Sequence, residues 1–125
     1  MHQAGQSRAL ILDDQASIAA FIEQVLISKG WQCTVLDDPT KLEGVLGADY
    51  DLVICDFRMP GRSGLEVFQH LRRHAPKLAG RFLLMTGDPS EVAGIVNEFG
   101  GVPFLMKPFG VAQLLQAVAR ITSPS

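Results

Sequence analysis

Four short apolar runs end in five polar residues, whose types suit the binding of a metal ion and a phosphoryl group. These residues are Asp13, Asp14, Asp56, Thr86 and Lys107. If the apolar runs are neighbouring parallel strands, these side chains meet at one edge of one sheet. That edge then carries three carboxylates, one hydroxyl and one ammonium group.

The three carboxylates predict a divalent metal site. Acids that converge within a few ångströms repel one another, and a cation must compensate for this repulsion if all of them are to stay ionised. Mg²⁺ suits such a site because it commonly takes one or two carboxylates together with water and phosphate oxygens. The alternative is that Asp13 and Asp14 only cap the helix that follows them. That alternative leaves Asp56 unexplained.

Asp56 is the acid best placed to act as a nucleophile. It ends a strand and faces a loop, residues 57–64, that contains two glycines and a proline. A carboxylate oxygen can attack phosphorus directly and form an acyl phosphate. Thr86 can donate its hydroxyl to one phosphoryl oxygen, and Lys107 can pair with another as a point charge. Taken singly, the last two are ordinary strand-end or solvated residues, but together they favour a phosphoryl site.

Strands that alternate with helices must position these side chains. Five runs rich in apolar residues have the length of strands: 9–12, 33–36, 52–55, 82–85 and 104–106. Apolar residues spaced three and four apart predict helices that end near Gly30 and Ile121. This alternation is the pattern of βαβ units with a parallel sheet.

Capping signals predict the helices in between. The T-x-x-E sequence at residues 40–43 predicts a second helix that ends around Gly47, and the S-x-x-E sequence at residues 63–66 predicts a third that ends before Pro76. Asp88 followed by proline predicts the start of a fourth.

The burial expected of each strand fixes the sheet order. The first, third and fourth strands are almost uninterrupted apolar runs and therefore belong in the middle, with the mixed second and short fifth strands at the edges. With right-handed crossovers, this gives a doubly wound, five-stranded parallel α/β sheet of order 2-1-3-4-5. Ligands of such sheets bind beyond the carboxyl ends of the first and third strands, where Asp13, Asp14 and Asp56 are expected.

Composition bounds the remaining classes of function. A chain of 125 residues with 47% hydrophobic and 19% charged residues is expected to fold as one domain, 1–125, with a core at about 8–121. The net charge of -2 argues against direct binding of nucleic acid. No apolar stretch approaches the ~20 residues that span a bilayer, and residues 1–8 do not resemble a signal peptide. We therefore expect no membrane insertion and a cytoplasmic location.

The linked motifs resemble the receiver domain of two-component response regulators. In chain order they are Ile11-Leu12-Asp13-Asp14, Asp56-x-x-Met59-Pro60-Gly61-x-x-Gly64, Met85-Thr86-Gly87 and Lys107-Pro108-Phe109. The resemblance covers residues 8–121 in the right order and spacing. It implies a flavodoxin-like (βα)5 receiver fold. The sequences around Gly87 and Lys107 are also similar to those of receivers attached to hybrid histidine kinases.

The resemblance implies specific roles. Asp56 would accept a phosphoryl group from a phosphohistidine on a histidine kinase or a histidine phosphotransfer protein. Mg²⁺ would be held by Asp13, Asp14, Asp56 and the main-chain carbonyl of Arg58. Thr86 and Lys107 would contact the phosphoryl group.

The resemblance also implies a switch. Thr86 would be drawn toward the new phosphoryl oxygens, and Phe104 would swing inward. Arg58 and Asp88 would tune the lifetime of the acyl phosphate, although Asp88 also fits a helix N-cap and Arg58 can pair with it. The peptide bond before Pro108 would be cis.

Together these inferences predict a phosphorylation-controlled signalling switch and not a turnover enzyme, with autodephosphorylation as its own reaction. Its surface would be read by a downstream protein or an attached output domain, or would form a homodimer on phosphorylation. The chain would be a single-domain regulator or a receiver segment of a larger protein. The alternatives are a docking module that does not use phosphate and a Mg²⁺-dependent phosphatase, which usually needs a second acid and a cap.

Overall fold

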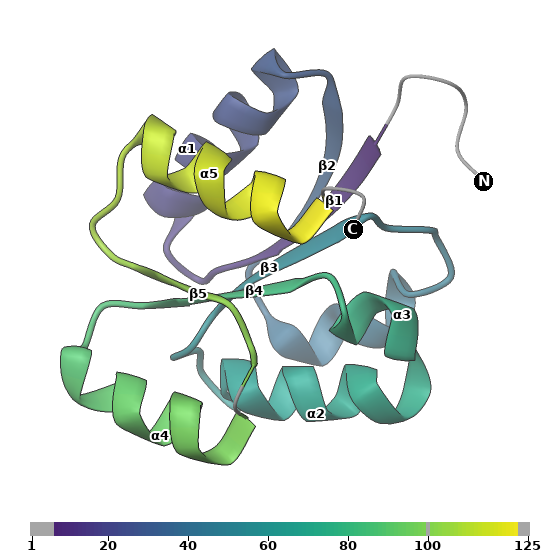
Figure 1. Cartoon of the computed structure of the whole chain (residues 1–125). Helices are drawn as coiled ribbons and strands as arrows, with labels where there is room; N and C mark the ends of the chain where they lie inside the picture. The colour runs from purple at the N-terminus through teal and green to yellow at the C-terminus, as the bar shows by residue number, and fades with distance from the viewer. Residues whose placement is uncertain (1–6, 100, 123–125) are drawn as a thin grey trace.

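A five-stranded parallel sheet with helices on both faces forms the core of the computed structural model, which describes residues 7–99 and 101–122 (Figure 1). The strands are β1 Ser7–Leu12, β2 Trp31–Leu36, β3 Leu52–Asp56, β4 Phe82–Thr86 and β5 Phe104–Met106. The helices are α1 Ala16–Ser28, α2 Gly64–His74, α3 Pro76–Ala79, α4 Pro89–Phe99 and α5 Val111–Thr122, and η1 Pro39–Gly44 is a 3-10 helix. The strand order is β2-β1-β3-β4-β5, which confirms the predicted doubly wound fold.

Apolar side chains on the two faces of the sheet form two hydrophobic cores. On β1, Ala9 and Ile11 pack with α1 and α5, and Leu10 and Leu12 pack with α2. Figure 1 shows α1 and α5 on one face of the sheet and α2 on the other. Successive residues of a strand point to opposite faces, so a strand covered on both sides must be apolar throughout. All five residues of β3 and all five of β4 are buried, which explains their uninterrupted apolar runs.

The register of the strands brings the predicted site residues together. Leu12 of β1 lies opposite Cys55 of β3, so the residues that follow them, Asp13 and Asp56, are neighbours. Thr86 of β4 lies opposite Met106 of β5, which immediately precedes Lys107. The carboxyl ends of four strands thus place their polar residues along one edge.

The second predicted helix differs from the structure in type, start and end. The chain forms a 3-10 helix over Pro39–Gly44 instead of an α-helix to Gly47. Asp38, not Thr40, is the cap, because its carboxylate accepts hydrogen bonds from the Thr40 amide at 2.9 Å and the Thr40 hydroxyl at 2.7 Å. The Thr40 hydroxyl is therefore used as a donor, and the predicted T-x-x-E capping box does not form.

The third predicted helix is confirmed as α2. The Ser63 hydroxyl accepts a hydrogen bond from the Glu66 amide at 3.1 Å, and the Glu66 carboxylate accepts one from the Ser63 amide at 2.9 Å. The sequence prediction did not include α3, a four-residue helix that begins at Pro76. Proline suits the first turn of a helix because the missing N–H has no partner there.

No helix within residues 7–99 and 101–122 combines the length and the apolar composition that a membrane crossing requires.

Candidate functional site

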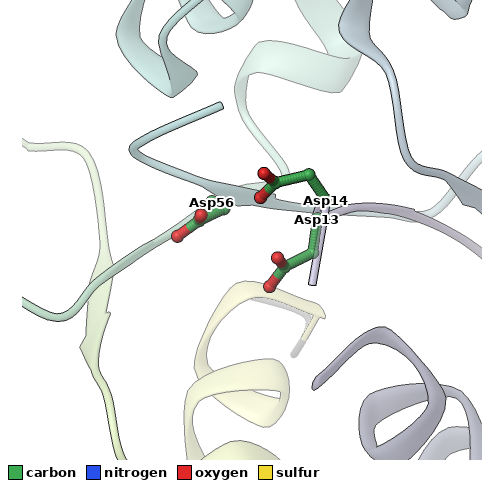
Figure 2. A group of neighbouring side chains, drawn as sticks. All are labelled: Asp13, Asp14 and Asp56. Carbon is green, nitrogen blue, oxygen red and sulfur yellow. The ribbon is translucent and has the colours of Figure 1, made fainter. Parts of the chain in front are cut away.

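Three carboxylates converge at the carboxyl ends of β1 and β3. Asp13, Asp14 and Asp56 each offer an oxygen, and these oxygens lie within 4.8 Å of one another. Figure 2 shows Asp13 and Asp14 following β1 and Asp56 at the end of β3. Asp13 and Asp56 are buried, with 1% and 7% of their surfaces exposed, whereas Asp14 is exposed. The predicted acid cluster is therefore present as a group open to solvent on one side.

Lys107 lies against two of these acids. Its Nζ atom is 3.1 Å from an oxygen of Asp13 and 3.1 Å from an oxygen of Asp56. It also donates a hydrogen bond to the side-chain oxygen of Gln15 at 3.2 Å. The lysine side chain is only 13% exposed, so water screens these ion pairs poorly.

The electrostatic balance of Asp56 favours a bound cation. Burial raises the pKa of its carboxyl group, Lys107 lowers it through a hydrogen bond and its charge, and the charges of Asp13 and Asp14 raise it. One ammonium group thus faces three carboxylates, and burial adds to the cost of ionising Asp56. An oxygen-only donor set with surplus negative charge fits Mg²⁺, a hard cation that favours the ionised acids.

Hydrogen bonds of the main chain fix the positions of these acids. The Asp13 amide donates to the Leu36 carbonyl at 3.1 Å, and the Asp13 carboxylate accepts from the Gln15 amide at 2.9 Å. The N-cap residue of α1 is Gln15, and it makes no side-chain cap hydrogen bond, so Asp13 closes a turn just before the helix and does not cap it. After β3, the Phe57 amide donates to the Met85 carbonyl at 2.7 Å, and the Gly64 amide donates to the Phe57 carbonyl at 2.8 Å.

The hydroxyl of Thr86 is engaged by residues that follow it. It donates to a carboxylate oxygen of Glu91 at 2.6 Å and accepts a hydrogen bond from the Asp88 amide at 3.2 Å. Glu91 lies in the first turn of α4, and its side chain is 8% exposed. The other Glu91 oxygen accepts a hydrogen bond from Nε of Arg58.

Arg58 and Asp88 face each other. Their charged groups lie 3.7 Å apart, which is the pairing that the sequence left open. Asp88 also accepts hydrogen bonds from the Ser90 amide at 2.9 Å and hydroxyl at 2.7 Å, and these bonds lower the pKa of its carboxyl group. The helix-cap role of Asp88 and its pairing with Arg58 are therefore both present.

One pocket of about 320 Å³ collects these groups. It is lined by Asp14, Gln15, Asp56, Phe57, Arg58, Thr86, Gly87, Asp88, Glu91 and Lys107. The sequence did not predict Gln15 and Glu91 as site residues, and Phe57 and Gly87 entered the prediction only as parts of a loop and a motif. Glu91 follows Asp88 and Pro89 at the predicted start of the fourth helix, but that pattern indicates a helix start and does not show which side chain turns toward the site.

Phe104 lies at the start of β5, opposite Leu84 of β4. It is 36% exposed, so it projects outward in this structure. The peptide bond between Lys107 and Pro108 is cis, the isomer that the resemblance implies.

Comparisons with known proteins identify the family and the fold of the chain. The family model described as response regulator receiver domain matches residues 9–119. The transcriptional regulatory protein DltR of Streptococcus agalactiae is 32% identical over 120 residues, which are 94% of this chain and 53% of that protein. The chain thus spans about half the length of this curated relative.

Solved structures of similar fold include two bacterial response regulators. The chemotaxis response regulator CheY4 of Vibrio cholerae has a TM-score of 0.81 at 24% identity, over 93% of this chain and 98% of that one. TrrA of Thermotoga maritima, a response regulator solved in complex with Mg²⁺-BeF, has a TM-score of 0.80 at 25% identity, over 92% of this chain and 98% of that one. Because the family model covers nearly the whole chain, the chain belongs to the response regulator receiver domain family, whose members are phosphoacceptors in two-component signalling.

Proposed function

We propose that Asp56 is the phosphoacceptor and that its donor is a phosphohistidine on a histidine kinase or a histidine phosphotransfer protein. The observation that carries the proposal is the convergence of Asp56, Thr86 and Lys107 on one pocket beside two further acids. An acceptor carboxylate needs both a cation and hydrogen-bond donors around the phosphoryl oxygens, and this pocket offers the residues for each.

Mg²⁺ would be held by Asp13, Asp14, Asp56 and the main-chain carbonyl of Arg58. The donor set described above supports this assignment, as does the Mg²⁺-BeF complex of TrrA. When bound, Mg²⁺ supplies positive charge that offsets the repulsion between a carboxylate and a phosphoryl group.

The chain's own residues would carry the transfer. An oxygen of ionised Asp56 attacks phosphorus, the P–N bond of phosphohistidine breaks, and its electron pair returns to the imidazole nitrogen. Lys107, already within 3.1 Å of Asp56, can turn one N–H toward a phosphoryl oxygen without leaving its place. The group stays on Asp56 until water hydrolyses it, so the chain is a modified switch and not a turnover enzyme on separate substrates.

Thr86 and Phe104 would carry the structural effect of phosphorylation to the surface. The new phosphoryl oxygens attract the Thr86 hydroxyl. Movement of Thr86 frees space at the end of β4 that the outward-facing Phe104 can fill, which changes the surface of α4 and β5. A downstream protein or an attached output domain would read this surface, or a second copy would dimerise on it.

The span 1–125 is proposed as a single receiver domain with its core at 8–121, which the family match to residues 9–119 supports. The hybrid-kinase origin and the cytoplasmic location stay predictions.

We expect Arg58 and Asp88 to slow hydrolysis of the acyl phosphate, because their paired side chains line the pocket and limit the approach of water. Arg58→Ala should shorten the half-life of the phosphorylated protein several-fold. The decay of the phosphorylated mass with time measures it, with Arg73→Ala on α2 as the control. An unchanged half-life contradicts the tuning role.

The proposal is tested by incubating the chain with Mg²⁺ and acetyl phosphate and measuring its intact mass. We expect a gain of one phosphoryl group that Asp56→Asn abolishes and that chelation of Mg²⁺ prevents. Asp37→Asn, which removes an exposed carboxylate outside the pocket, should leave the gain unchanged. No uptake from acetyl phosphate or from any phosphohistidine donor would favour a docking module that does not use phosphate.

A further inference from the structure

We infer that Glu91 is a positioning residue that holds the Thr86 hydroxyl away from the phosphoryl site in the unphosphorylated chain. The inference rests on the proposed function of Asp56 and Thr86, and it adds a residue that opposes the switch. We call the contact between Thr86, Glu91 and Arg58 the latch.

The hydroxyl of Thr86 has one proton, and Glu91 is its nearer acceptor, at 2.6 Å against 3.4 Å for the Asp88 carbonyl. The O–O distance of 2.6 Å is typical of a hydrogen bond to a charged oxygen, which is shorter and stronger than a neutral one. The same hydroxyl oxygen accepts the Asp88 amide at 3.2 Å. Thr86 cannot donate to a phosphoryl oxygen on Asp56 without breaking its bond to Glu91.

Glu91 is itself held in place. Its second carboxylate oxygen is bonded to Arg58, two residues after Asp56, and its side chain is only 8% exposed. Its position in the first turn of α4 also favours a negative charge. The carboxylate therefore joins Thr86, at the end of β4, to Arg58, in the loop that follows the phosphoacceptor, and it is fixed by a partner on each side.

Phosphorylation of Asp56 would add oxygens that compete with Glu91 for both of its partners. Oxygens on a phosphorylated Asp56 attract the Thr86 hydroxyl and the Arg58 guanidinium, both of which line the same pocket. If they succeed, Glu91 is left as a nearly buried charge without those two partners, which is unfavourable. The first turn of α4 must then move to expose Glu91. The latch thus raises the free energy needed to move Thr86 toward the phosphoryl group, and it couples this movement to a shift of α4.

The test uses beryllofluoride, a non-covalent analogue of the phosphoryl group, in Mg²⁺ buffer, with binding followed by ¹⁹F NMR. Glu91→Ala should bind it about tenfold more tightly, because the hydrogen bond to a charged group that opposes binding is gone. Glu23→Ala, which removes a carboxylate from α1 on the other face of the sheet, is the control for net charge and should match the wild type.

Repeating the substitution in a Thr86→Val variant separates the effect of the latch from simple charge repulsion between Glu91 and beryllofluoride. In Thr86→Val there is no hydroxyl to release, so adding Glu91→Ala should give a smaller gain in affinity than it gives in the wild type. In the free protein, the Thr86 methyl resonance of Glu91→Ala should shift toward its position in the beryllofluoride-bound wild type. An equal gain in both backgrounds, or no gain in the wild-type background, overturns the latch.

Failure of the proposed function gives a different result. If neither the wild type nor Glu91→Ala binds beryllofluoride, or if Asp56→Asn still binds it, then the proposed site is wrong and the latch is wrong with it. If the wild type binds it, Asp56→Asn does not, and Glu91→Ala equals the wild type, only the latch is wrong.

Discussion

Replacing Lys107 with methionine should lower the free energy of unfolding of the metal-free protein by about 3 kcal/mol. The ammonium group lies 3.1 Å from both Asp13 and Asp56, and all three side chains are at least 87% buried, as their exposed fractions of 13%, 0% and 10% show. Removing it leaves two buried carboxylates without their cation. Chemical denaturation in the presence of a chelator measures the change.

Mg²⁺ should restore part of the stability lost in Lys107→Met. A cation that binds only the folded state stabilises it, and the acid cluster of this variant remains complete. Lys41→Met is the matched control, because Lys41 pairs with Asp37 at 3.6 Å on the surface, where the two side chains are 63% and 74% exposed. Its effect should be below about 1 kcal/mol. Equal losses in the two variants would contradict a structural role for Lys107 in the site.

Replacing Gly64 with alanine should destabilise the protein by about 2 to 3 kcal/mol and slow phosphoryl uptake about tenfold or more. A β-carbon at this position would lie 2.5 Å from the main-chain oxygen of Asp56, 2.7 Å from a methyl carbon of Leu84 and 3.0 Å from the α-carbon of Phe57. Two of these atoms belong to the backbone, so the acceptor residue itself must shift. Denaturation and the rate of uptake from acetyl phosphate measure the two effects.

Gly94 provides the matched control for Gly64. It lies inside α4, and a β-carbon there would meet no atom within 4 Å. Gly94→Ala should therefore raise the free energy of unfolding by up to about 1 kcal/mol, because alanine is the better helix former. If Gly64→Ala were as well tolerated as Gly94→Ala, the close packing of α2 against the acceptor strand would be refuted.

The sequence predicted the sheet and the strand-end residues because both depend on local patterns. Strands that are buried on both faces must be apolar along their whole length, and the first polar residue marks where each one ends. The order of the strands then brings those ends to one edge. Asp13, Asp56, Thr86 and Lys107 could be placed together from this reasoning before any contact was known.

The remaining features depend on competition or on tertiary contacts. Asp38 and Thr40 are both able to cap a helix, and the short sequence does not show which oxygen accepts and which donates. The contact of Glu91 with Thr86 and Arg58 requires α4 and the loop after β3 to approach each other, and no periodicity in the sequence encodes that approach. Strand ends can be placed together from the order of the sheet, but a contact between a helix and a loop needs the folded structure.

The most direct test of the account is to identify the modified residue chemically. Borohydride reduces the acyl phosphate of an aspartate to homoserine, and peptide mass spectrometry then locates it in the sequence. After phosphorylation with acetyl phosphate and Mg²⁺, we expect homoserine at position 56 and at no other acid. Homoserine at Asp13 or Asp14, or a phosphorylated chain with no homoserine, would contradict the assignment of Asp56 as the phosphoacceptor.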